Sequence, residues 1–99
     1  MNISETKTED GLVLHIDGKV DKITSNQVQT AILTSVQKTM NLTVDFSKVQ
    51  YVSSAGLRAL LLGQKSANAK GGSMKLCGVN EEVMSVFKLT GFDKVLTID

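Results

Sequence analysis

Two adjacent serines, Ser53 and Ser54, mark the point where a strand-like pattern changes to a helix-like pattern. Two small residues, Ala55 and Gly56, follow them and lead into a leucine-rich stretch. The first turn of a helix leaves backbone N–H groups without intrahelical partners, and the helix dipole places partial positive charge there. A phosphate or carboxylate group at this position is therefore stabilised electrostatically, which makes the start of this helix a candidate functional site.

A purely structural role for Ser54 is the alternative. As the N-cap of the helix, its side-chain oxygen would accept a backbone hydrogen bond and stabilise the fold by roughly 1 kcal/mol. This role accounts for one serine but not for the run of small residues at 53–56. Glycine at position 56 costs roughly 1 kcal/mol relative to alanine inside a helix, which suggests that another group approaches the backbone there. The residues alone leave both interpretations open.

The chain offers no partner for nucleophilic catalysis by these serines. Its only histidine, His15, lies in a predicted strand near the N-terminus, and no Gly-x-Ser-x-Gly motif is present. A P-loop would need a glycine-rich loop that ends in lysine and then serine or threonine, which the chain lacks. A single histidine also excludes a metal site built on paired histidines. Because none of these catalytic or binding motifs is present, we expect no metal, no cofactor and no enzymatic activity.

Asp45 closes a predicted strand over 42–46 and is a further candidate phosphate acceptor, because receiver domains carry such an aspartate at a strand end. Receiver domains also place an acidic pair after their first strand, and the chain has no such pair at the corresponding place. The better-supported expectation is that the Asp45 carboxylate accepts hydrogen bonds from backbone N–H groups near Ser47.

The elements that must position these residues begin with a hairpin and a helix. Residues 2–17 alternate in polarity around a turn at Glu9-Asp10-Gly11, which predicts two paired strands. The next helix is predicted from about Thr24 to Thr39. Its start has the spacings of a capping box and a hydrophobic staple: Thr24 with Gln27, and Ile23 with Val28.

The later patterns predict alternating strands and helices. They are a strand over Leu42–Phe46, a helix over Ser54–Ala69, a strand around Met74–Cys77, a helix from the N-cap Asn80 to Gly91, and a last strand within Val95–Ile98. A strand, an amphipathic helix and a second strand indicate a right-handed crossover between parallel strands. We therefore predict an α/β fold, with a four- or five-stranded mixed sheet and three to four helices.

The bulk composition limits the possible functions. Ninety-nine residues, of which 41% are hydrophobic and 21% charged, suit one domain over 1–99 with one core. A net charge of +1 without a basic stripe, and 4% aromatic residues, argue against nucleic-acid binding. No apolar run approaches the roughly 18 to 20 residues of a membrane span, and the polar N-terminus does not resemble a signal peptide. We therefore expect a cytoplasmic protein in which Cys77, the single cysteine, forms no internal disulfide.

The chain resembles the STAS domain from Asp45 and Ser47 through the run Ser53-Ser54-Ala55-Gly56-Leu57 into the leucine-rich stretch. The resemblance covers nearly the whole chain and is closest to the stand-alone bacterial anti-sigma factor antagonists. It implies a partner that is both an anti-sigma factor and a serine kinase of the GHKL type. The unphosphorylated antagonist would bind this kinase and release the sigma factor; phosphorylation would end binding, and a PP2C-type phosphatase would restore it.

Carried over residue by residue, the resemblance places the phosphorylated serine at Ser54, with Gly56 and Leu57 matching the motif directly. Ser53 stands where the family commonly has aspartate and is a rival acceptor, whereas Ala55 replaces a second hydroxyl residue. The Gly18–Asp21 segment resembles a loop that lies beside the phosphorylation site in the family. The partner surface that the resemblance implies comprises Asp21, Thr24, Ser53, Ala55, Gly56, Leu57 and Arg58.

One alternative from a different functional class remains. The same motif is compatible with a STAS-like scaffold or regulatory subunit of a transport or signalling complex that is never phosphorylated. The Ser-Ser-Ala-Gly run at 53–56 favours the switch but does not exclude the scaffold.

Overall fold

The protein, described here by a computed structural model over residues 1–99, alternates strands and helices along most of its length. In chain order the elements are β1 (Asn2–Lys7), β2 (Leu12–Val20), α1 (Ser25–Lys38), β3 (Asn41–Val52), α2 (Ser54–Ala69), β4 (Ser73–Cys77), α3 (Glu81–Thr90), the 3-10 helix η1 (Phe92–Lys94) and β5 (Thr97–Ile98). The predicted α/β class and the predicted number of helices are confirmed.

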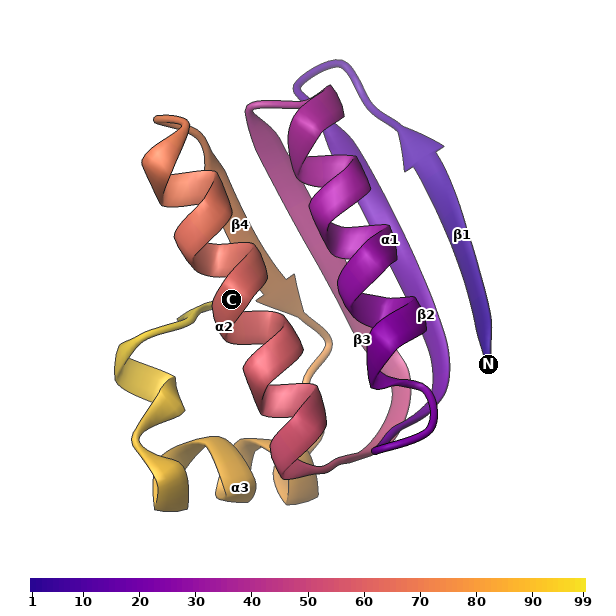
Figure 1. The fold of residues 1–99 in the computed structure, drawn as a ribbon, viewed down its shortest axis with the longest axis vertical. Coiled ribbons are helices and arrows are strands. Elements are labelled where there is room, and N and C mark those ends of the chain that lie inside the picture. The colour runs from indigo at the N-terminus through magenta and orange to yellow at the C-terminus, as the bar shows by residue number, and fades with distance from the viewer.

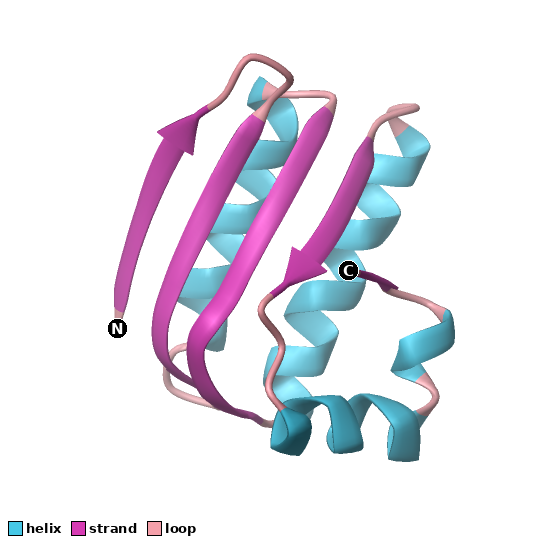
Figure 2. Ribbon diagram, turned by 180° about the vertical axis from the view of Figure 1, so that it is seen from behind, coloured by secondary structure: helices cyan, strands magenta, loops and turns pink.

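The five strands form one mixed sheet in the order β1-β2-β3-β4-β5. β1 pairs antiparallel with β2, and every other neighbouring pair is parallel. Helices α1 and α2 lie side by side on one face of the sheet, and α3 lies across the end at which β3 and β4 finish (Figure 1). No helix covers the opposite face of β1, β2 and β3 (Figure 2).

The core lies between the sheet and the α1–α2 pair. Alternate residues of β2, Leu12, Leu14 and Ile16, are buried as the polarity pattern predicts, and the inward stripe of α1 buries Val28 and Ile32 completely. Side chains from both layers join one hydrophobic cluster. This packing fixes α2 against the sheet and thereby fixes the position of its first turn.

β2 and β3 are both longer than predicted. β3 was expected to end at Phe46, but it continues to Val52 because Val49 and Val52 are buried in the core. The prediction failed because Ser47 and Lys48, both exposed, interrupt the alternation where the pairing with β2 is irregular. The extended strand delivers its end directly to the start of α2, so no loop separates them.

The helix boundaries at the C-terminal half follow the sequence signals. α2 occupies the predicted residues, Asn80 caps α3 by accepting a hydrogen bond from the Val83 N–H at 2.8 Å, and Gly91 ends α3 in the left-handed conformation with φ 78°. The final strand is an edge strand of two residues.

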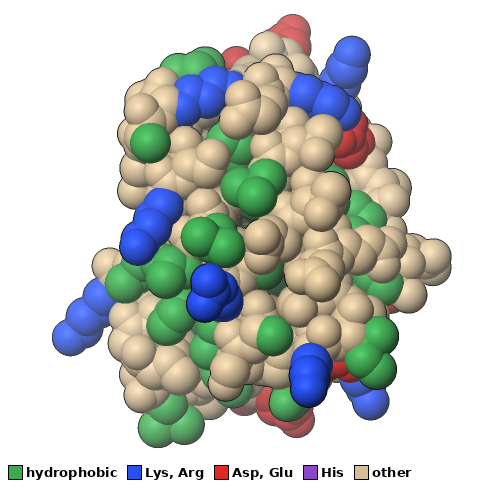
Figure 3. Space-filling model, in the orientation of Figure 1, with side chains coloured by type: hydrophobic (Ala, Val, Ile, Leu, Met, Phe, Trp, Pro, Cys, Tyr) green, Lys and Arg blue, Asp and Glu red, His purple; other side chains and the backbone are tan.

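The surface over α1 and α2 is mixed in character. Lysine and arginine side chains are spread over this face instead of forming one stripe (Figure 3). None of the helices has both the length and the hydropathy that crossing a membrane requires.

Candidate functional site

Ser53, not Ser54, is the N-cap of α2. Its backbone is extended, and its Oγ accepts a hydrogen bond from the Gly56 N–H at 3.3 Å. The carbonyl of the half-buried Ser53 also accepts the first intrahelical bond, from the Leu57 N–H at 2.9 Å. The structural role considered for Ser54 therefore belongs to its neighbour, and the hydroxyl of Ser53 is already engaged.

Ser54 is the first helical residue, and its side chain is exposed. Its hydroxyl makes no hydrogen bond within the chain, and no acidic side chain occupies the first turn of α2. The backbone N–H groups at this end have no intrahelical partner by position. Arg58 lies one turn further on, is exposed and forms no ion pair within the chain. An anion on Ser54 would meet only favourable electrostatics from its own helix.

Gly56 and Leu57 are buried, so they shape the start of α2 instead of presenting a surface. A Cβ at position 56 would lie 2.7 Å from Cγ1 of Val20 and 2.9 Å from its carbonyl oxygen. The close approach that the sequence suggested is therefore real, but it comes from within the fold. Both residues were expected to contact a partner, and this burial leaves them little exposed surface for such a contact.

Asp21 caps the approach to α1 and replaces the capping box expected at Thr24 and Gln27. The Asp21 Oδ1 accepts hydrogen bonds from the N–H of Ile23 at 2.9 Å and of Thr24 at 3.0 Å. In return, the Thr24 Oγ1 accepts a bond from the Asp21 N–H at 3.0 Å. The reciprocal pair is a capping box displaced by three residues, because aspartate is the stronger cap and threonine can serve as its partner. Thr24 makes no capping hydrogen bond to α1.

The same turn holds Asp21 in its charged form and exposes Ile23. The hydrogen bond from the Thr24 N–H, followed by other donors in the turn, lowers the pKa of Asp21 below its ordinary value. Ile23 is 88% exposed, so the staple predicted between Ile23 and Val28 does not form. An exposed apolar side chain in this turn was not predicted from the sequence. The position of Ile23 between the polar residues Lys22 and Thr24 was a signal that could have indicated it.

The Asp21 turn and the start of α2 lie at the same end of the sheet (Figure 1). The link is direct, because the Ser53 N–H donates to the Val20 carbonyl at 2.8 Å and Val20 pairs with Val52. The fold thus brings the Asp21 turn next to the two serines, as the resemblance to the STAS domain implied. We call this surface, made of residues 21–24 with 53–55 and 58, the switch end.

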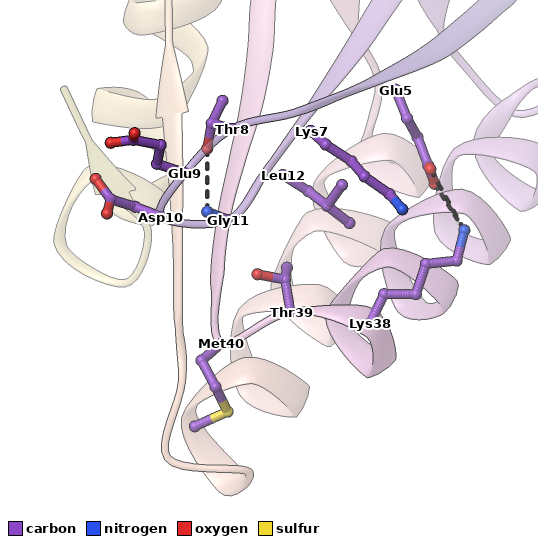
Figure 4. Close-up of a pocket in the computed structure, with 10 residues that line it drawn as sticks. All are labelled: Glu5, Lys7, Thr8, Glu9, Asp10, Gly11, Leu12, Lys38, Thr39 and Met40. Carbon is purple, nitrogen blue, oxygen red and sulfur yellow. Dashed lines mark hydrogen bonds and ion pairs between the residues drawn. The ribbon is translucent and has the colours of Figure 1, made fainter.

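None of the four cavities of the structure is lined by Ser53 or Ser54. The largest, about 630 Å³, lies at the other end of the molecule between the β1–β2 turn and the end of α1. Figure 4 shows that its walls carry charges of both signs, including the ion pair between Lys38 and Glu5 at 3.1 Å. The switch end is an open surface by comparison.

A polar network on the helix-free face of the sheet was not predicted as a unit. His15 contacts Thr6 through Nε2 and Asp45 through Nδ1, both at 2.9 Å, and so joins three strands. Asp45 also accepts a hydrogen bond from the Ser47 N–H at 2.9 Å, as expected. Partial burial would raise the pKa of Asp45, but the bonds from Ser47 and His15 outweigh it and hold this pKa below its usual value.

Cys77, the single cysteine, is half-buried. Partial burial raises the pKa of the Cys77 thiol, which disfavours the reactive thiolate. No group of three or more His, Cys, Asp and Glu side chains is placed to hold a metal ion. The feature with the clearest chemical consequence is therefore the free hydroxyl of Ser54.

Comparison with known families identifies the class of protein. The sequence profile of the STAS domain matches residues 2–99, and the chain belongs to the STAS domain family. Among individual relatives, the anti-sigma F factor antagonist of Paenibacillus polymyxa is 28% identical over 89 residues, which cover 88% of this chain and 76% of that protein.

Solved structures confirm the predicted fold. An anti-sigma factor antagonist from Mycobacterium paratuberculosis matches with a TM-score of 0.88 at 21% identity, covering 98% of this chain and 83% of that chain. The Bacillus cell fate determinant SpoIIAA in its phosphorylated form matches with a TM-score of 0.73 at 17% identity, covering 99% of this chain and 91% of that chain.

Proposed function

We propose that the protein is an anti-sigma factor antagonist whose binding to an anti-sigma factor is switched off by phosphorylation of Ser54. The observation that carries the proposal is the exposed hydroxyl of Ser54, which is free of hydrogen bonds at the first position of α2. The name of the relative from Paenibacillus polymyxa and the phosphorylated form of SpoIIAA support it. Sigma factors act on transcription, so the proposal places the protein in the cytoplasm.

Ser54 is preferred over Ser53 because of what each hydroxyl already does. A kinase must place the acceptor hydroxyl against the transferred phosphoryl group, which requires access from outside. Ser53 is half-buried and its Oγ is held by the Gly56 N–H, whereas Ser54 is exposed.

Phosphorylation of Ser54 acts on the interface and not on the fold. The phosphate adds about −1.5 to −2 charge at a helix N-terminus, where Arg58 can pair with it. The modified domain therefore stays folded. Partner release follows because the dianion must be desolvated at the interface near Asp21 and any acidic groups of the partner. Asp21, Thr24, Ala55 and Arg58 form the contact surface.

The partners in this proposal are a serine kinase of the GHKL type that is also the anti-sigma factor, and a PP2C-type phosphatase that removes the phosphate. The protein itself acts by binding and not by catalysis. The open surface around Ser54 suits another protein better than a small substrate, because small-molecule sites are concave.

The decisive test is mass spectrometry of the protein purified from its native host with phosphatases inhibited. The tryptic peptide Val49–Arg58 contains both serines and no other hydroxyl except Tyr51. Phosphate on Ser54 is the expected result. Phosphate on Ser53 would keep the switch but move its site, and an unmodified peptide across growth and stress conditions would favour the STAS scaffold or regulatory subunit.

A further inference from the structure

Ile23 is the most exposed of the large hydrophobic side chains, at 88%. The others are Leu89 at 87%, Tyr51 and Val95 at 50%, and Met40 at 47%. A single exposed apolar residue needs no explanation by itself, because much of any protein surface is apolar. Its setting distinguishes Ile23 from the rest.

The backbone beneath Ile23 is held by side chains. Its N–H donates to the Asp21 Oδ1 at 2.9 Å, and the Thr24 Oγ1 donates to the Lys19 carbonyl at 2.6 Å. Together with the displaced capping box, these bonds fix both sides of the turn. A side chain presented on such a turn loses less conformational freedom on binding than one on a mobile loop, so more of its apolar contact appears as affinity.

The position of Ile23 ties it to the proposed switch. The turn that carries it follows directly from Val20, whose carbonyl accepts the Ser53 N–H at 2.8 Å. A partner surface of about 800 Å² that is centred on Ser54 extends over the adjacent turns at this end of the sheet, and the Asp21 turn is one of them. Ile23 is therefore part of the surface that the partner must cover.

We infer that Ile23 is the apolar anchor of the switch end and enters an aliphatic pocket on the anti-sigma factor. This inference rests on the proposed function. It divides the tasks at the interface, because Ile23 supplies affinity by desolvating apolar surface while Ser54 makes that affinity conditional on its charge state. Phosphate beside a desolvated anchor must itself lose water, which is why one modification can release a tightly held partner.

The test is a graded series measured by titration calorimetry. The probe is the purified GHKL-type kinase from the same organism, with ADP present so that no phosphate is transferred. Ile23→Val removes one methylene and should weaken binding about fourfold; Ile23→Ala removes three carbons and should weaken it about fiftyfold. Melting temperatures should stay unchanged, because the side chain is 88% exposed in the folded chain.

Leu89→Ala is the matched control, because Leu89 is 87% exposed but lies toward the far end of α3. It should leave binding unchanged. Ser54→Asp tests the proposed function separately. Loss of binding in Ser54→Asp with full binding in Ile23→Ala would overturn the anchor and keep the switch. Equal losses of affinity in Ile23→Ala and Leu89→Ala would also overturn the anchor. A wild-type chain that does not bind the kinase would contradict both the anchor and the proposed function.

Discussion

The two ends of the α1–α2 pair treat their polar groups in opposite ways. At the switch end, the capping groups of Asp21 and Ser53 come from the adjacent turns, and the Ser54 hydroxyl is left without a partner. At the other end, Lys70 reaches across from α2 and donates to the carbonyls of Val36 and Thr39 near the end of α1. One end closes the structure, and the other end presents a free hydroxyl.

Under the proposed function, cavity size does not locate the functional site in this fold. The end with the largest cavity is the one whose polar groups are engaged with each other, as the pair of Lys38 with Glu5 shows. The switch end has no cavity but holds the exposed hydroxyl of Ser54, the proposed phosphorylation site. A protein partner suits a surface of this second kind, since a stable interface spreads over about 800 Å² on each side.

The largest effect is expected from a charge placed at the switch end. Ser54→Asp should weaken binding of the kinase at least about a hundredfold, because a desolvated charge at an interface costs several kcal/mol. The melting temperature should stay within about a degree, since the charge is favourable at a helix N-terminus. Calorimetric titration and thermal unfolding measure the two quantities.

Ser73→Asp is the control at the opposite end, where Ser73 is also exposed. It should leave binding of the kinase unaltered. A comparable loss of affinity in both variants would mean that the two ends do not differ in function, and unfolding of Ser54→Asp would mean that the switch acts through the fold.

Gly56→Ala should give the largest loss of stability. The new Cβ would lie 2.7 Å from Cγ1 of Val20 and 2.9 Å from Cγ1 of Val52, so the start of α2 must shift. Overpacking of this kind costs about 1–3 kcal/mol, which urea unfolding would detect. Ser54→Ala, a change at an exposed neighbour, should stay within about 0.5 kcal/mol. A stable Gly56→Ala variant would show that the turn at the switch end is not tightly held.

The sequence predicted the architecture of the switch end better than its hydrogen bonds. Local patterns were sufficient for α2, because its leucines and the small residues before it are contiguous. They were insufficient for the caps. The observed caps are Asp21 in place of Thr24, and Ser53 in place of Ser54. Neighbouring polar residues compete for the same backbone N–H donors, and a local pattern does not show which of them has the backbone conformation of a cap.

The network of His15 with Thr6 and Asp45 could not be predicted for a related reason. Its members are separated by 9 and 30 residues along the chain, and only the register of three strands brings them together. Strand pairing is a tertiary property, and a single sequence shows which face a residue occupies but not which residue stands opposite.

Lys70→Met tests the closed end with a smaller expected effect. Methionine keeps the aliphatic stem but cannot donate to the carbonyls of Val36 and Thr39, so stability should fall by about 1 kcal/mol. Binding of the kinase should be unchanged. Lys65→Met, on the same helix and without such a bond, is the matched control for urea unfolding. Equal stabilities of the two variants would show that Lys70 does not close this end.

Asp45 lies on the helix-free face, away from both ends, and should give the smallest effect. Since its pKa is lowered in the folded state, its charged form stabilises the fold above the ordinary carboxyl pKa of about 4. That contribution should be lost as the pH falls through the lower, folded pKa. The stability difference between wild type and Asp45→Asn, measured by urea unfolding between pH 2 and 6, should therefore shrink only below about pH 4. A difference that does not depend on pH would mean that the carboxylate charge contributes nothing, and that the hydrogen bonds to His15 and Ser47 act equally well through an amide.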